Sequence, residues 1–166
     1  VPIALVQHMP PVFTRMFASR LQGASGLDVV EATEGVALRA GRVVLAPGDH
    51  HLVLDDRAGD LVGRLDRGPQ VNSCRPSADV LFRSAVEVSG GVLGVVMTGL
   101  GRDGCDGAAA IVRAGGRVIA QDRESSVAWG MPGAVVEAGL ASRVVRLEEL
   151  GASIGAAVGC RGVAPC

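Results

Sequence analysis

The sequence predicts an α/β fold: a doubly wound, mainly parallel sheet flanked by helices, with an antiparallel β-hairpin inserted. Three observations support this prediction. Short aliphatic runs alternate with segments of helical periodicity along most of the chain. One apolar run, residues 92–97, leads directly into a glycine-rich turn, as expected of a strand buried on both faces of a parallel sheet. Between residues 35 and 68, apolar pairs alternate with turn signals such as Pro47-Gly48, which indicates a hairpin.

The individual elements follow from local patterns. The first strand is expected to be buried and to end at Gln7-His8, and the prolines after Met9 suit the first turn of a helix. Four apolar side chains at helical spacing predict that this helix is amphipathic: Phe13, Met16, Phe17 and Leu21. A later helix is expected to start at Ser77 or Asp79. The other predicted elements are strands at residues 3–6, 27–31, 92–97, 117–121 and 144–145, and helices at residues 12–22, 108–114, 134–138 and 147–158.

Composition limits the possible functions. A chain of 166 residues with 48% hydrophobic residues predicts one domain, residues 1–159, and the last residues, 160–166, are expected to be a disordered tail. A net charge of −1 and only 2% aromatic residues argue against nucleic acid as a partner. The longest uncharged run, residues 88–101, is too short for membrane insertion. Four cysteines without metal-ligand spacing indicate a reduced, cytoplasmic setting; no metal and no cofactor are expected.

The glycine-rich turn at residues 98–104 has three interpretations. In the first interpretation, Asp103 caps the helix that follows, and the glycines only permit a tight turn. Alternatively, Gly99, Gly101 and Gly104 form a G-x-G-x-x-G dinucleotide site, with Asp122 at the next strand end as the ribose-binding acid. Against this, a carboxylate at Asp103 would meet the pyrophosphate. In the third interpretation Asp103 is catalytic and orients His8, since the carboxyl ends of parallel strands meet at one sheet edge.

Five motifs in order resemble one family, the catalytic domain of the chemotaxis protein-glutamate methylesterases (CheB). They are Gln7-His8-Met9-Pro10, Ala46-Pro47-Gly48, the segment Arg75 to Phe82, the segment Met97 to Gly104, and Gly130-Met131-Pro132.

The resemblance implies a Ser-His-Asp esterase that demethylates glutamyl methyl esters, and deamidates glutamines, on the cytoplasmic helices of chemoreceptors. It assigns His8 and Asp103 as catalytic and places Thr98, Gly99, Leu100 and Gly101 near the substrate and the oxyanion. Leu100 stands where the family usually has Met. It also implies a possible partner outside this chain, a phosphorylatable receiver domain.

The family's nucleophile is a serine in a Gly-x-Ser-x-Gly-Gly turn after an earlier strand, and the chain is expected to be N-terminally incomplete and to lack it. Ser25 and Ser153 lie in similar patterns, but each is expected within or at the end of a helix rather than on a nucleophile elbow. Cys105 is expected to pack in the hydrophobic core and to have no catalytic role. These 166 residues alone are therefore expected to be inactive or nearly so.

Two other functions compete with the esterase: a non-catalytic module that binds a receptor or another partner, and the dinucleotide-binding domain. Several remaining polar side chains are expected on the solvated surface: His50, His51, Arg75, Arg83 and Arg102.

Overall fold

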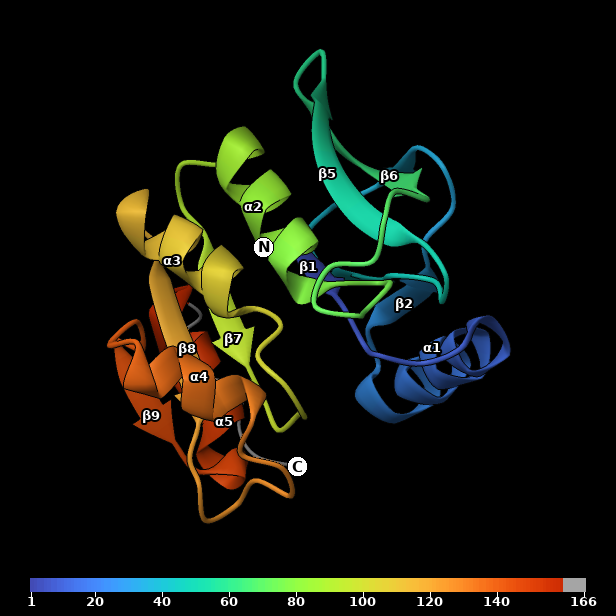
Figure 1. Cartoon of the computed structure of the whole chain (residues 1–166). Coiled ribbons are helices and arrows are strands. Elements are labelled where there is room, and N and C mark those ends of the chain that lie inside the picture. The colour runs from blue at the N-terminus through green and yellow to red at the C-terminus, as the bar shows by residue number, and fades with distance from the viewer. Residues whose placement is uncertain (160–166) are drawn as a thin grey trace. The chain divides into compact units, whose positions relative to one another are not determined.

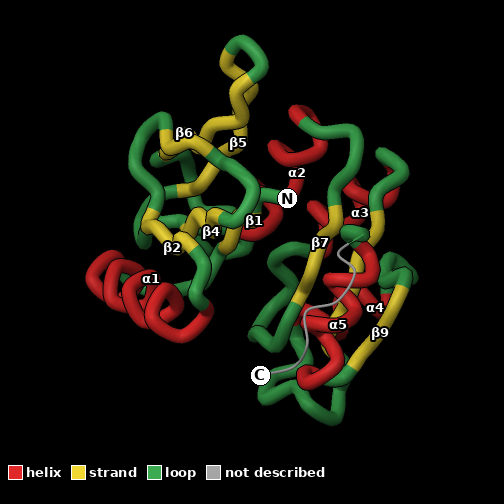
Figure 2. Tube along the Cα trace, turned by 180° about the vertical axis from the view of Figure 1, so that it is seen from behind, coloured by secondary structure: helices red, strands yellow, loops and turns green. Residues whose placement is uncertain are grey.

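The structure is a computed structural model, and it describes residues 1–159. The chain divides into two compact units, Val1–Ser89 and the part from Gly90 onward. Figures 1 and 2 show helices and strands alternating within each unit. The division into one domain therefore stays a prediction, and the predicted tail at residues 160–166 lies outside the described residues.

The first unit contains a parallel sheet and an antiparallel sheet. The parallel sheet has the order β1-β4-β2, and the antiparallel sheet has the order β3-β6-β5. The elements are β1 (Ile3–Leu5), α1 (Pro11–Ser25), β2 (Asp28–Glu31), β3 (Val36–Ala37), β4 (Arg42–Leu45), β5 (His51–Arg57), β6 (Asp60–Asp66) and α2 (Ala78–Val88). The β5–β6 hairpin closes through Ala58 and Gly59, both at positive φ, as a two-residue turn requires.

Two aliphatic clusters hold this unit together. Helix α1 packs on the parallel sheet through Ala18, Val29 and Leu45, and α2 packs on the antiparallel sheet through Leu81 and Leu52. The predicted apolar stripe of α1 is wrong in part. Phe13 and Met16 are 52% and 63% exposed, because the sheet contacts the helix face that carries Thr14 and Ala18 instead.

The second unit is built on a parallel sheet with the order β7-β8-β9. Its elements are β7 (Leu93–Val96), α3 (Cys105–Arg113), β8 (Arg117–Gln121), α4 (Met131–Glu137), β9 (Arg143–Val145) and α5 (Leu147–Ala157). Ile119 of β8 is fully buried and packs with Val145 and Leu150. The predicted fold class is confirmed, since parallel sheets flanked by helices and one antiparallel sheet are all present.

Some element boundaries and burial expectations differ from the prediction. Helix α3 starts at Cys105 rather than Ala108, directly after Gly104 at φ 90°. Helix α4 starts at Met131 because Pro132 fits its first turn. Strand β1 is partly exposed rather than buried, with Ile3 at 42%; among the described residues it pairs only with β4.

Candidate active site

His8 lies in the short segment between β1 and α1, and its side chain is exposed. The N–H of Met9 donates to the carbonyl of Gln7 at 2.8 Å, which folds the backbone around the histidine. Pro10 and Pro11 then start α1 directly, because proline suits the first turn of a helix. The sequence therefore predicts the position of His8 correctly: it follows the carboxyl end of a parallel strand.

The backbone after His8 is held by Gly48. A Cβ at this position would overlap the nitrogen of Pro11 and lie 2.7 Å from the carbonyl oxygen of Met9. The N–H of Gly48 also donates to the hydroxyl of Thr14 at 3.1 Å, and this hydroxyl lies 2.6 Å from a carboxylate oxygen of Glu31. The Ala46-Pro47-Gly48 motif thus fixes the segment that presents His8.

Asp103 belongs to the second unit and is 1% exposed. It stands two residues before α3, where the helix dipole favours a negative charge. The structure differs from the cap interpretation in position: the N-cap residue of α3 is Gly104, one residue after Asp103.

The turn at Thr98 and Gly99 is held by hydrogen bonds within the second unit. The N–H of Thr98 donates to Oε1 of Gln121 at 2.9 Å, and the N–H of Gly99 donates to the carbonyl of Ala128 at 3.1 Å. In contrast, the N–H groups of Leu100 and Gly101 make no hydrogen bond within the described part of the chain. Both N–H groups can therefore serve a ligand.

Gly99 and Gly130 bring two loops into direct contact. A Cβ on Gly130 would lie 2.7 Å from the Gly101 nitrogen, and a Cβ on Gly99 would overlap the sulfur of Met131. The Gly130-Met131-Pro132 motif is therefore the packing partner of the glycine-rich turn.

The dinucleotide interpretation does not agree with this geometry, because the Gly99 N–H is already bonded. The carboxylate of Asp122 is also engaged, since it accepts from the Ser125 N–H and hydroxyl. These hydrogen bonds, above all the one from the Ser125 hydroxyl, lower the pKa of Asp122 and tie its Oδ1 to the loop that follows β8.

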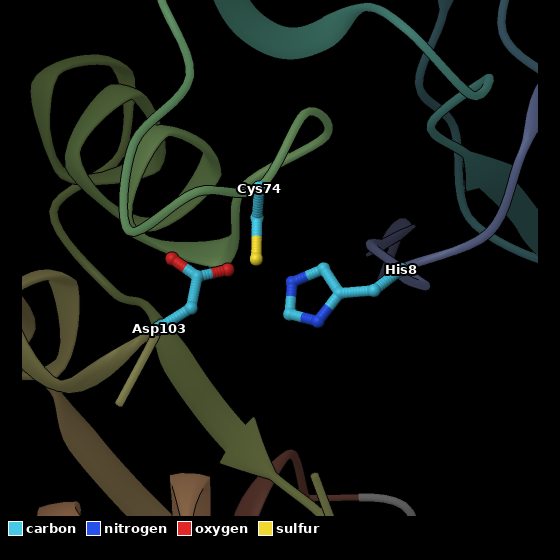
Figure 3. A group of neighbouring side chains, drawn as sticks. All are labelled: His8, Cys74 and Asp103. Atoms are coloured by element: carbon cyan, nitrogen blue, oxygen red, sulfur yellow. The ribbon is translucent and has the colours of Figure 1, made fainter. Parts of the chain in front are cut away.

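A cavity of about 320 Å³ opens beside His8 within the first unit. Its walls include Met9, Gln70, Cys74, Arg75 and Pro76. The thiol of Cys74 points toward the imidazole ring of His8 (Figure 3), and Sγ lies within 4.8 Å of a ring nitrogen. Zinc sites use three or four protein ligands, so this pair alone does not define a metal centre.

The loop that carries Cys74 is fixed by residues that the sequence analysis placed on the surface. His51 is 1% exposed; its Nδ1 accepts from the Ser77 N–H at 3.2 Å and its Nε2 lies 3.0 Å from the carbonyl of Pro69. The expectation of a surface residue is wrong for His51, because the start of α2 covers the first residue of β5. A histidine in a turn-rich sequence carries no signal of this burial.

Arg75 is also expected on the solvated surface, but its side chain is held by hydrogen bonds within the first unit. Its guanidinium bonds Asp49 through Nε and Nη2 and donates to the carbonyl of Gly68 at 2.9 Å. The hydrogen bond from Arg75 is the main reason why the pKa of Asp49 is lowered. Arg83 is exposed, and Arg102 is exposed and pairs with Asp106, as expected for a solvated surface.

The serines with nucleophile-like patterns lie in helices. Ser25 is the last residue of α1 and its hydroxyl donates to the carbonyl of Leu21 at 2.7 Å. Ser153 is within α5 and 5% exposed. Neither follows a strand, as a nucleophile elbow requires. Cys105 is 5% exposed and its thiol contacts the carbonyl of Ala134, which confirms it as part of the core.

The fold and the site together define an α/β protein whose chemistry-bearing side chains follow the carboxyl ends of parallel strands, the usual layout of α/β enzymes. The model of the family described as "CheB methylesterase" matches residues 1–154. The chain belongs to the CheB methylesterase family.

Named relatives agree with this assignment. A Nocardioides protein named protein-glutamate methylesterase/protein-glutamine glutaminase is 57% identical over 93% of this chain, and a Caulobacter vibrioides protein with the same name, numbered 2, is 51% identical over 90%. The chain spans 42% and 44% of their lengths. The crystal structure of the Thermotoga maritima CheB methylesterase catalytic domain matches with a TM-score of 0.90 and 40% identity, over 92% of this chain and 82% of that one. In the described residues, no helix is long and apolar enough to cross a membrane.

Proposed function

We propose that the protein containing these residues hydrolyses glutamyl methyl esters on the cytoplasmic helices of chemoreceptors, releasing methanol, and deamidates glutamines on the same helices. The observation that carries the proposal is the family match over residues 1–154, which includes both His8 and Asp103. The names of the relatives support both activities. The proposed reaction takes place in the cytoplasm.

In the proposed mechanism, His8 is the general base. Its imidazole takes the proton of a serine hydroxyl as the oxygen attacks the ester carbonyl, and returns that proton to the departing methoxide. Asp103 hydrogen-bonds to the other ring nitrogen and stabilises the imidazolium. Water then attacks the acyl-enzyme by the same route and leaves a free glutamate. With a glutamine substrate, the departing group is ammonia.

The oxyanion of the tetrahedral intermediate needs preorganised donors. In the turn at residues 98–101, the N–H groups of Thr98 and Gly99 are already bonded, which leaves those of Leu100 and Gly101 for this role. Thr98 and Gly99 then act by holding the turn in place. The side chain of Leu100 is 82% exposed, which suits a residue beside a bound substrate.

The nucleophile is proposed to be a serine other than Ser25 and Ser153, supplied by a segment outside these 166 residues. Two facts support this: both serines lie in helices, and the relatives are more than twice as long as the part that matches. The 166-residue chain alone is then expected to release almost no methanol. A receiver domain in the longer protein is a further proposed partner, since the family resemblance implies one.

The test is methanol release from methylated receptor by the full-length protein. His8→Gln and Asp103→Asn are each expected to lower the rate by about 10³- to 10⁴-fold, the loss typical of triad residues. His50→Gln and Asp106→Asn are matched controls, because both residues lie near the same elements and neither has a proposed role.

Receptor binding without any methanol release would instead favour a non-catalytic module. Wild-type turnover by Asp103→Asn would overturn the proposed triad. Ser153→Ala is expected to keep full activity, and a loss of turnover in that variant with an unchanged fold would show that the nucleophile lies within this chain.

A further inference from the structure

Cys74 has no role in the proposed reaction, yet it lies beside the proposed general base. Its Sγ is within 4.8 Å of a ring nitrogen of His8, and both side chains line the same cavity of about 320 Å³ (Figure 3). Cys74 is partly exposed, so small molecules in this cavity have access to it. A thiol that an imidazole can deprotonate is the arrangement that makes cysteines reactive.

The loop presents this thiol in a defined position. Val71 and Cys74 exchange two backbone hydrogen bonds, at 3.1 and 2.9 Å, across a two-residue turn. Asn72 and Ser73 form the turn at φ 50° and 61°. The side chain of Asn72 then donates to the carboxylate of Asp79 on α2 at 2.7 Å, which ties the turn to a helix. The position of the Cys74 thiol is therefore set by the fold rather than by a free loop.

The cavity also has room for a modifying group. A volume of about 320 Å³ is at the lower end of the range for small-molecule sites. Its charged wall is the Arg75–Asp49 ion pair, in which the two charges compensate each other. The Cys74 thiol donates to the carbonyl of Asn72 at 3.4 Å, and the imidazole of His8 lies beside it on the cavity wall. The other described cysteine, Cys105, is buried in the core and has no such access.

We propose that Cys74 is a modification site that takes small disulfides, and that its S-thiolation switches the esterase off. The imidazole of His8 accepts the Cys74 proton, and the thiolate attacks one sulfur of the disulfide. A new Cys74 S–S bond forms, the original S–S bond breaks, and the second half leaves as a thiolate that takes the proton from His8. The inhibitory consequence rests on the proposed catalytic role of His8, because the attached group fills the cavity beside its ring.

The experiment treats the full-length protein with glutathione disulfide at neutral pH and follows the mass of the peptide that contains Cys74. Cys74 is expected to be modified well before Cys105. His8→Gln is expected to slow the modification about tenfold, because the proton acceptor is lost. His50→Gln is the matched control and is expected to leave the rate unchanged, since His50 does not line the cavity.

Methanol release is measured on the same samples. It is expected to fall in proportion to the modified fraction and to return with dithiothreitol, while Cys74→Ser is active and resists the disulfide. Modification of Cys105 as fast as Cys74, a rate independent of His8, or full activity after complete modification would each overturn the proposal. If the untreated protein releases no methanol, the proposed function fails. The effect of His8→Gln on the rate of Cys74 modification still tests whether His8 activates the Cys74 thiol.

Discussion

Gly48 and Pro11 are in direct backbone contact, and this contact fixes the segment that follows His8. A Cβ on Gly48 would overlap the Pro11 nitrogen and come within 2.6 Å of the Pro10 carbonyl carbon. These neighbours are backbone atoms at the start of a helix, so they cannot move aside as a flexible side chain would. The contact explains why glycine follows Pro47 at this position.

Gly48→Ala is therefore expected to destabilise the protein by about 1–3 kcal/mol, the usual cost of overpacking, and to lower esterase activity by displacing His8. Urea unfolding and methanol release measure the two effects. Gly23→Ala is the matched control: Gly23 lies in α1, and a Cβ added there would have nothing within 4 Å. This control is expected to stabilise the helix by about 0.5–1 kcal/mol. Equal stability of the two variants would contradict the role of the contact.

Gln121→Met is expected to loosen the glycine-rich turn. The buried amide of Gln121 accepts from the Thr98 N–H and donates to the Ser125 carbonyl at 2.8 Å. Methionine has a similar size but leaves both partners unsatisfied, at a cost of about 1–3 kcal/mol for each buried group. Thermal unfolding measures the loss, and methanol release is expected to fall with it. The exposed Gln22→Met serves as the control and is expected to change neither.

His51→Leu removes the two contacts that hold the loop before α2. The Pro69 carbonyl and the Ser77 N–H would lose their partner, at about 1–3 kcal/mol each. Urea unfolding of this variant is compared with that of His50→Leu, in which the half-buried neighbour loses one contact to the Gly48 carbonyl at 3.3 Å. A larger loss in the His50 variant would show that His51 does not support the loop.

Asp49 makes the stability of the protein depend on pH in the acidic range. Its pKa is lowered from 3.8, mainly by the hydrogen bond from Arg75, so the folded state holds the carboxylate more strongly in its charged form. The stabilisation is complete well above pH 3.8 and is lost as the pH falls through the lower folded-state pKa. Asp49→Asn is expected to be less stable than wild type at pH 7.

The difference between wild type and Asp49→Asn should shrink as the pH is lowered below 3.8, because the wild-type carboxyl becomes protonated. Thermal unfolding at a series of pH values measures this. Asp60→Asn, at an exposed hairpin position, is the control. A difference that stays constant with pH would contradict the role of the charge on Asp49.

Local sequence was sufficient to predict the type and order of most elements. The strand at residues 117–121 has the predicted bounds, and the helices have their predicted positions within a few residues. These features depend on periodicity and on glycine and proline, which act over a few neighbouring residues. For the same reason the positions of His8 and Asp103 after strands could be predicted, whereas their catalytic pairing remains a proposal.

Only the tertiary structure decided which side chains are buried and which distant residues meet. His51 and Phe13 show this: the polar residue is 1% exposed and the aromatic one 52%, because packing of α2 and of the parallel sheet selects the covered faces. The approach of Cys74 to His8 joins positions that are distant along the chain and share no motif. The sequence determined the elements and the candidate residues, and long-range packing determined which of them share a cavity.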